Sequence, residues 1–133
     1  MLRVVIDTNV VVSAIVWDGK PRELVLKLLE QHTVILSSQM LAELNDVISR
    51  DKFGVKTFQV KRFLADLTNK SKIVHSVGLF KIIVEDPDDN NILDAAYSGK
   101  ADYIVTGDKH LLALGKFKRT KIITVNNMLE IIS

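Results

Sequence analysis

The sequence has no cysteine, and its three histidines stand apart from one another. The absence of cysteine excludes disulfide bonds and thiolate zinc sites, and it fits a reducing compartment. The six glycines are scattered, so there is neither a P-loop nor a dinucleotide-binding glycine pattern. The G-x-S-x-G elbow of a serine hydrolase is missing as well.

Long apolar runs are also missing. The longest apolar stretch, 10–17, contains a serine and is far shorter than the roughly 18 residues of a membrane-spanning helix. Near the start of the chain, Asp7 interrupts the only apolar region that could serve as a signal peptide. We therefore expect a cytoplasmic protein without a membrane segment.

The composition is that of an ordinary globular domain. Of the 133 residues, 47% are hydrophobic and 26% are charged. A chain of this size is most simply one domain, 1–133, and it should bury roughly two-thirds of its unfolded surface on folding. No repeat, low-complexity segment or linker divides it.

The formal net charge is only +2, but the charges are segregated along the chain. Seven bases and two acids lie within 50–72, and four further bases lie within 116–121. Such clusters are typical either of a nucleic-acid-binding surface or of a solvated face that keeps a small protein soluble. The residues that we expect to contact a nucleic acid are Lys52, Lys56, Lys61, Arg62 and Lys109.

Strand-like and helix-like segments alternate along the chain. Nearly all-apolar runs predict strands of a parallel sheet that is covered on both faces. These runs lie at 3–6, 33–36, 103–106 and 122–125, with further candidates at 73–74 and 79–84. Apolar residues at helical spacing predict the helices between them. The expected helices lie at 10–16, 21–29, 38–48, 60–67, 86–98, 109–114 and 127–132. This alternation indicates an α/β fold.

Two aspartates stand just after expected strands. Asp7 follows the first strand directly, and Asp108 follows the strand at 103–106 after one glycine. Parallel sheets bind ligands outside the carboxyl ends of their strands, so the two side chains can meet there. Each also fits a second interpretation, because an aspartate after a strand commonly caps the following helix. The occurrence of two such residues favours a site.

Other acids lie on expected helices. Glu43 falls beside the apolar stripe of its helix, where it either pairs with a lysine or is aimed at the strand ends. Asp86, Asp88 and Asp89 lie in a first helical turn, where the helix dipole alone favours acids. Asp94 lies in the middle of the same helix, where aspartate is a poor helix former. It is therefore either exposed or needed for its carboxylate.

A cluster of these carboxylates requires a counter-charge. Two carboxylates about 4 Å apart repel by roughly 4 kcal/mol at an effective dielectric of about 20. The cluster therefore takes up protons or a cation, and oxygen ligands favour Mg²⁺ or Mn²⁺ over zinc. Such ions assist phosphodiester hydrolysis. The candidate ligands are Asp7, Glu43, Asp89, Asp94 and Asp108. Polar neighbours that either orient them or act only as turn and cap residues are Thr8, Asn9 and Thr106.

Four motifs in this order and spacing match a known family. They are V-V-I-D-T-N at 4–9, L-A-E-L at 41–44, D-P-D-D-N-x-x-L-D-A-A at 86–96 and Y-I-V-T-G-D-K-H-L-L at 103–112. Over nearly its whole length the chain resembles the PIN-domain nucleases. It resembles in particular the small prokaryotic PIN proteins related to the VapC-type toxins of toxin–antitoxin systems.

The resemblance implies a three-layer α/β/α sandwich with a central, mostly parallel sheet, whose acids bind Mg²⁺ or Mn²⁺ and hydrolyse single-stranded RNA. Asp7, Glu43 and Asp108 match the family's first, second and fourth acids. The third acid is Asp89 or, as the alternative, Asp94. A homodimer and, for a toxin, a cognate antitoxin partner are further implications.

Three other functions fit parts of the pattern. An RNA-processing nuclease outside any toxin–antitoxin pair would need the same residues. A phosphatase of the haloacid-dehalogenase kind also begins with an aspartate after a strand, but Asn9 stands where its second aspartate would be. A non-catalytic module that binds RNA or protein would use the basic faces, and its carboxylates would serve as helix caps.

Overall fold

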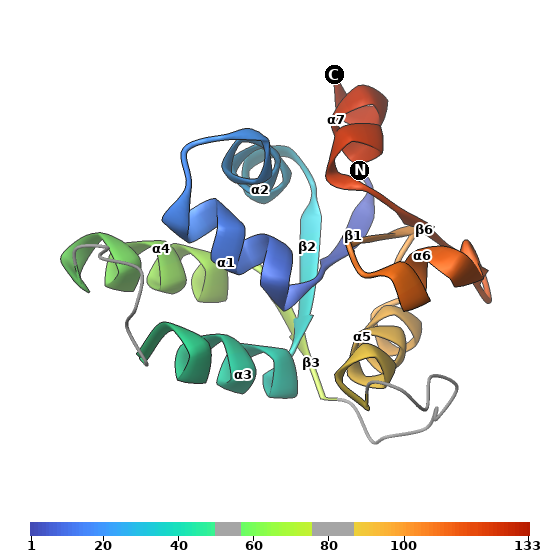
Figure 1. Cartoon of the computed structure of the whole chain (residues 1–133), viewed down its shortest axis with the longest axis horizontal. Helices are drawn as coiled ribbons and strands as arrows, with labels where there is room; N and C mark the ends of the chain where they lie inside the picture. The colour runs from blue at the N-terminus through green and yellow to red at the C-terminus, as the bar shows by residue number, and fades with distance from the viewer. Residues whose placement is uncertain (50–56, 76–86) are drawn as a thin grey trace.

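The computed structural model describes residues 1–49, 57–75 and 87–133. Within these residues, six strands form one sheet in the order β3-β2-β1-β4-β6-β5 (Figure 1). All neighbouring pairs are parallel except β5 and β6. The strands are β1 (Arg3–Ile6), β2 (Thr33–Ser37), β3 (Lys72–Val74), β4 (Tyr103–Val105), β5 (Lys116–Phe117) and β6 (Thr120–Ile123).

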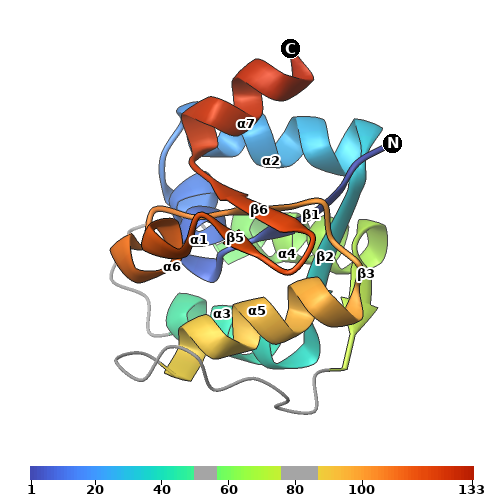
Figure 2. The same ribbon diagram turned by 90° about the vertical axis from the view of Figure 1, so that its right-hand side faces the viewer.

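Helices cover both faces of the sheet. Figures 1 and 2 show α1 to α4 on one side of it and α5 on the other, while α7 packs against α2. The helices are α1 (Thr8–Val16), α2 (Lys20–Gln31), α3 (Ser38–Ser49), α4 (Thr57–Lys70), α5 (Pro87–Ser98), α6 (Lys109–Leu114) and α7 (Val125–Ile132). The predicted three-layer sandwich with a mostly parallel sheet is confirmed. None of the described helices is long and apolar enough to span a membrane.

The core centres on β1, which lies between β2 and β4. Val5 stands opposite Ile35 on one side and Ile104 on the other, and all three are 0% exposed. A strand in this position has no solvent-facing side, which explains its uninterrupted apolar sequence.

The structure corrects the end of the chain. The strand expected at 122–125 is β6, at Thr120–Ile123, and Val125 begins α7 instead. The reason is a helix cap, since the side chain of Thr124 accepts a hydrogen bond from Asn127 N at 3.2 Å. The two-residue edge strand β5 was not predicted from the sequence. The expected strand at 79–84 and Asp86, which was expected in the first turn of a helix, lie outside the described residues.

The order of the strands creates a crevice between β1 and β4. From β1 the chain continues to β2 on one side, and from β4 it continues to β6 on the other. In open α/β sheets, ligands bind outside the carboxyl ends of the strands where the connections diverge in this way. Asp7 and Asp108 follow the strands on the two sides of this point.

Gly99 sets how closely α5 approaches β2. A Cβ atom at this position would lie 2.6 Å from Ile35 Cγ2 and 3.1 Å from Ala95 O. We expect Gly99→Ala to lower the free energy of unfolding by about 1–3 kcal/mol, because either the helix or Ile35 must move. Urea denaturation measures the change. Gly107→Ala is the control, because its Cβ would meet no described atom within 4 Å. Equal stabilities of the two variants would contradict the expectation.

Candidate active site

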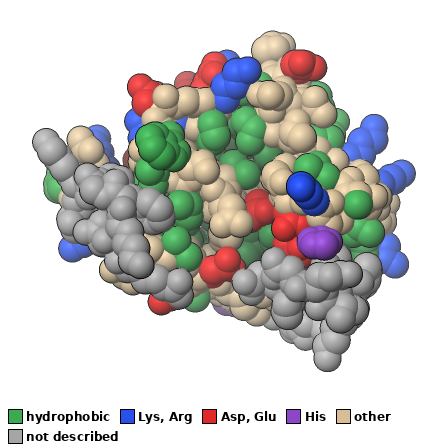
Figure 3. Space-filling model, in the orientation of Figure 1, with side chains coloured by type: hydrophobic (Ala, Val, Ile, Leu, Met, Phe, Trp, Pro, Cys, Tyr) green, Lys and Arg blue, Asp and Glu red, His purple; other side chains and the backbone are tan. Residues whose placement is uncertain are grey.

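Acidic side chains gather in the middle of one face of the molecule. Figure 3 shows them beside a hollow, next to a histidine and a lysine or arginine. This region lies at the carboxyl ends of β1 and β4 (Figure 1).

Asp7 joins the end of β1 to the start of α1. Its backbone N–H donates to Val105 O at 3.0 Å, which fixes it beside the end of β4. Asp7 is 3% exposed, and each of its carboxylate oxygens accepts a hydrogen bond. Oδ1 accepts from Asn9 N at 3.1 Å, and Oδ2 accepts from the hydroxyl of Thr106 at 2.7 Å. The orientation of the carboxylate is therefore set from both sides.

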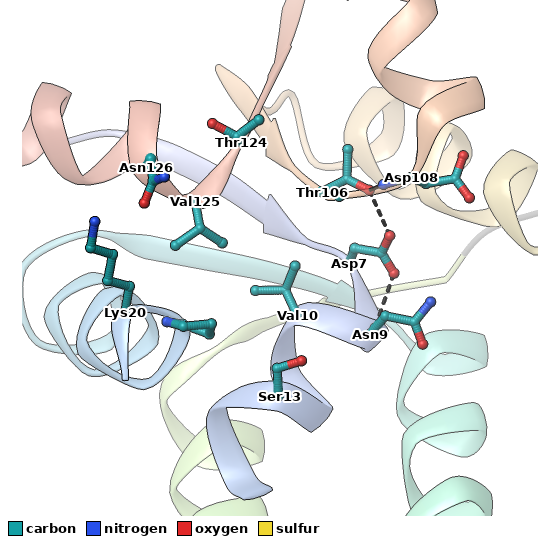
Figure 4. Close-up of a pocket in the computed structure, with 12 residues that line it drawn as sticks. Asp7, Asn9, Val10, Ser13, Lys20, Thr106, Asp108, Thr124, Val125 and Asn126 are labelled. Atoms are coloured by element: carbon teal, nitrogen blue, oxygen red, sulfur yellow. Dashed lines mark hydrogen bonds between the residues drawn. The ribbon is translucent and has the colours of Figure 1, made fainter. Parts of the chain in front are cut away.

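Thr106 connects the two aspartates. Its side chain is almost fully buried, and its single hydroxyl proton goes to Asp7 Oδ2. The same hydroxyl oxygen accepts a hydrogen bond from Asp108 N at 3.0 Å. One hydroxyl thus orients the Asp7 carboxylate and holds the backbone that carries Asp108 (Figure 4).

Asp108 is the N-cap of α6. Its Oδ1 accepts hydrogen bonds from His110 N at 2.8 Å and Leu111 N at 3.2 Å. Among the described residues, no donor is recorded for Oδ2. Asp7 likewise caps α1. Both aspartates therefore cap helices, and both also line the cavity at the crevice, so capping does not exclude a role in ligand binding.

Glu43 is linked to the start of α1. It lies on α3, which begins after Ser37, whose hydroxyl accepts from Met40 N at 3.0 Å. Glu43 is partly buried, and its Oε1 accepts a hydrogen bond from the hydroxyl of Thr8 at 3.1 Å. Because Thr8 follows Asp7 directly, this contact ties α3 to the edge of the crevice.

The two acids of α5 are buried. Asp89 is 3% exposed and Asp94 is 2% exposed. The alternative that Asp94 is a solvent-exposed residue is thereby excluded. Among the described residues, Asp7 and Asp108 line the cavity at the carboxyl ends of β1 and β4, and Asp89 and Asp94 are not part of its lining.

A cavity of about 570 Å³ opens beside Asp7 and Asp108. Figure 4 shows that it extends from these acids past Val10 toward Lys20. Its walls come from the ends of β1, β4 and β6 and the starts of α1, α2 and α7. The lining residues are Asp7, Asn9, Val10, Ser13, Lys20, Pro21, Thr106, Gly107, Asp108, Thr124, Val125 and Asn126.

The donors at this cavity fit a hard cation. Among the described residues, no three acidic or histidine side chains are grouped as a ready-made metal cage. Mg²⁺ does not require one, because it is commonly held by one or two carboxylates together with water and substrate phosphate. Asp7 and Asp108 supply carboxylate oxygens at one end of an open cavity, which meets that requirement.

The basic residues expected to contact nucleic acid are only partly described. Lys61 and Arg62 are exposed on α4, and Lys109 is exposed at the start of α6, next to Asp108. Lys52 and Lys56 lie outside the described residues. Of these five bases, Lys109 is the one that is adjacent in sequence to an aspartate of the candidate site, Asp108.

The cavity lining includes Lys20, Thr124 and Asn126, which were not singled out from the sequence. Lys20 stands directly before the proline that begins an expected helix, and this carried no indication of what it faces. Thr124 and Asn126 follow β6. Ending that strand at Ile123 would have placed them at a carboxyl end beside Thr106, where a parallel sheet binds ligands.

Comparisons with known proteins identify a matching family, a related sequence and a similar fold. A family model described as PIN domain matches residues 3–110. An uncharacterized protein of Methanocaldococcus jannaschii is 27% identical over an alignment of 137 residues. The alignment covers 96% of this chain and 83% of that protein. The fold is similar to VapBC2 from Rickettsia felis, solved bound to a DNA fragment from their promoter. That match has a TM-score of 0.64 and 20% identity, and it covers 92% of this chain and 98% of the other.

Proposed function

The chain belongs to the PIN domain family, whose members are generally nucleases that use divalent metal ions, and from this premise we propose that it is a metal-dependent endoribonuclease that hydrolyses single-stranded RNA. The observation that carries the proposal is the pair Asp7 and Asp108. Thr106 joins them at the carboxyl ends of β1 and β4, and they face an open cavity.

Asp7 and Asp108 are the residues that would hold Mg²⁺ or Mn²⁺. When bound, such an ion makes a water molecule more acidic and neutralises charge on the phosphate. Thr106 keeps the Asp7 carboxylate in one orientation, and the amides of His110 and Leu111 hold Asp108. Two carboxylates fixed in this way lose little conformational entropy when a cation binds.

We assign further roles to the remaining candidates. Glu43, tied to the crevice through Thr8, and the buried acids Asp89 and Asp94 are proposed to complete the acidic set. Of the last two, Asp89 is the preferred third ligand. The exposed bases of α4 and α6 are proposed to attract the RNA backbone. These bases are Lys61, Arg62 and Lys109, and Lys52 and Lys56 are proposed to act with them.

The direct test is cleavage of a long, end-labelled single-stranded RNA by the purified protein. We expect cleavage with added Mg²⁺ or Mn²⁺ and none with EDTA, because the two carboxylates then have no cation to hold. Fragments of intermediate length at early times would show endonucleolytic attack. Cleavage that persists in EDTA would contradict the proposed mechanism.

We also propose that the nuclease is a homodimeric toxin with a cognate antitoxin. The likeness to VapBC2 supports this, and so do exposed apolar side chains at the end of α1 and on α2 and α4. Trp17, Leu26 and Phe58 are 69%, 50% and 74% exposed, and Leu26 lines a cleft together with Val60 and Phe63. Exposed apolar groups of this kind are typical of protein-binding surfaces.

A neighbouring gene distinguishes this role from RNA processing. A short upstream reading frame for a DNA-binding protein, whose product co-purifies with this chain and stops its cleavage of RNA, would support the toxin role. An isolated gene would favour an RNA-processing nuclease with the same active site.

A further inference from the structure

The cavity beside Asp7 and Asp108 has two chemically different ends. Both acids that line it lie at one end, where Thr106 joins them. At the other end lies Lys20, close to the start of α7 at Asn126 (Figure 4). An acidic end attracts a cation and a basic end attracts an anion, so one extended ligand can satisfy both.

Among the described residues, no acidic side chain pairs with Lys20. The two nearest acids in the sequence pair with other bases: Asp18 lies 4.0 Å from Arg22, and Glu23 lies 3.4 Å from Lys27. Within the part of the chain that the structure describes, Lys20 forms no ion pair. Its ammonium group, exposed at the cavity, is therefore available to an anion.

The backbone around Lys20 strengthens this preference. The cavity is lined by the first residues of α2 and α7, where helices carry partial positive charge. The N-cap of α2 is Gly19 and that of α7 is Thr124, so neither cap brings a negative charge. The acid-capped helices α1 and α6 begin at the opposite end of the cavity.

An apolar surface separates the two ends. Figure 4 shows Val10 and Val125 between Lys20 and Asp7, with Ser13 below them. Flat nucleobases pack against apolar and aromatic side chains, and their edges accept and donate hydrogen bonds. The volume of about 570 Å³ lies within the roughly 300–1,000 Å³ that is usual for small-ligand sites.

We propose that this cavity binds one nucleotide of the RNA strand next to the phosphodiester that is cleaved. Its base lies against Val10 and Val125, and its outer phosphate is bound by Lys20. The phosphate at the acidic end is the one that reacts. The inference rests on the proposed ribonuclease function, and it makes Lys20 a positioning residue that does not touch the reacting atoms.

Equilibrium binding tests this without cleavage. Fluorescence anisotropy with a labelled single-stranded RNA is measured in EDTA for the wild type, Lys20→Ala and Lys27→Ala. Lys27 is the matched control, because it lies on the same helix, outside the cavity, and its loss changes the net charge equally. Lys20→Ala should bind about 10-fold more weakly, as expected for one charged hydrogen bond. For this variant, the plot of the logarithm of the binding constant against the logarithm of the salt concentration should have a slope that is shallower by about 0.7. This is the contribution of one phosphate contact on a single strand.

A methylphosphonate scan locates the phosphate. Replacing one phosphate at a time removes one negative charge from a defined position of the RNA. For the wild type and Lys27→Ala, replacing the phosphate next to the cleaved bond should weaken RNA binding. For Lys20→Ala, the same replacement should have no effect on RNA binding. An equal penalty in Lys20→Ala and the wild type would overturn the inference, as would RNA binding that is unchanged by Lys20→Ala.

Cleavage in Mg²⁺ separates this inference from the function on which it rests. RNA cleavage by a protein whose affinity does not depend on Lys20 overturns the inference alone. Binding that depends on Lys20, without any cleavage, supports the nucleotide site and overturns the proposed nuclease function. A wild-type protein that binds no single-stranded RNA overturns both.

Discussion

Asp7→Asn is expected to reduce RNA cleavage in saturating Mg²⁺ by about 1,000-fold or more, since loss of a ligand charge removes several kcal/mol of transition-state stabilisation. The substitution keeps the size of the side chain and changes only one oxygen. An amide oxygen is a weaker ligand for a hard cation than a carboxylate. Initial rates on a labelled single-stranded RNA measure the effect.

The fold of this variant should be unchanged. Asparagine is as good an N-cap as aspartate, so the hydrogen bond from Asn9 N can be retained. The hydroxyl of Thr106 has two lone pairs, which allows it to accept from the new amide and from Asp108 N together. We therefore expect a urea unfolding midpoint close to that of the wild type.

A matched control separates the site from net charge. Asp18→Asn makes the same change at a side chain that is 93% exposed, outside the lining of the cavity. It should cleave RNA at the wild-type rate. If Asp7→Asn remained within about 10-fold of the wild type while folding normally, Asp7 would be a helix cap alone and the non-catalytic alternative would gain support.

The strands at the centre of the sheet were predictable because buried strands have continuous apolar sequences. A strand with neighbours on both sides and helices on both faces must be apolar throughout, as Val4, Val5 and Ile6 are. The same rule fails at the edge of the sheet. β5 has two residues, Lys116 is exposed, and only Phe117 is buried, so no apolar run marks this strand.

The start of α7 shows a different limit. The run from Ile122 to Val125 contains three β-branched apolar residues and reads as one continuous strand. What ends the strand is the hydroxyl of Thr124, which caps the helix. Threonine is common both in strands and at caps, so the sequence alone does not distinguish them. Because the predicted strand ran to Val125, the sequence did not indicate that the residues after β6 line the cavity.

At the candidate site, the sequence pattern alone does not decide the role of each acidic residue. For Asp7 and Asp108 the sequence offered capping and ligand binding as alternatives, yet a carboxylate has enough lone pairs to cap a helix with one oxygen and face a ligand with the other. For Asp94 the sequence left two alternatives, a solvent-exposed side chain or a carboxylate needed for function. The burial of Asp94 excludes the first alternative. The contact between Thr106 and Asp7 joins residues 99 positions apart, and no local spacing indicates it.

Thr106→Val should lower cleavage by about 10- to 100-fold, the usual cost of losing a hydrogen-bond partner of a metal ligand. Valine has nearly the same shape and the same preference for an extended backbone, so the hydroxyl is the main loss. Without it, Asp7 Oδ2 loses a donor at 2.7 Å and Asp108 N loses an acceptor at 3.0 Å. The carboxylate of Asp7 and the backbone of Asp108 are then free to separate.

The metal dependence of the rate distinguishes this role from simple packing. We expect Thr106→Val to need a higher Mg²⁺ concentration for half-maximal cleavage, and Thr106→Ser, which retains the hydroxyl, to stay within a few-fold of the wild type. Metal-induced changes in the thermal unfolding midpoint should follow the same order, independent of catalysis. A Thr106→Val protein that is less stable but has an unchanged Mg²⁺ dependence would show that the hydroxyl supports the fold alone. In that case, the two aspartates would be held for metal binding by their backbone positions at the ends of β1 and β4.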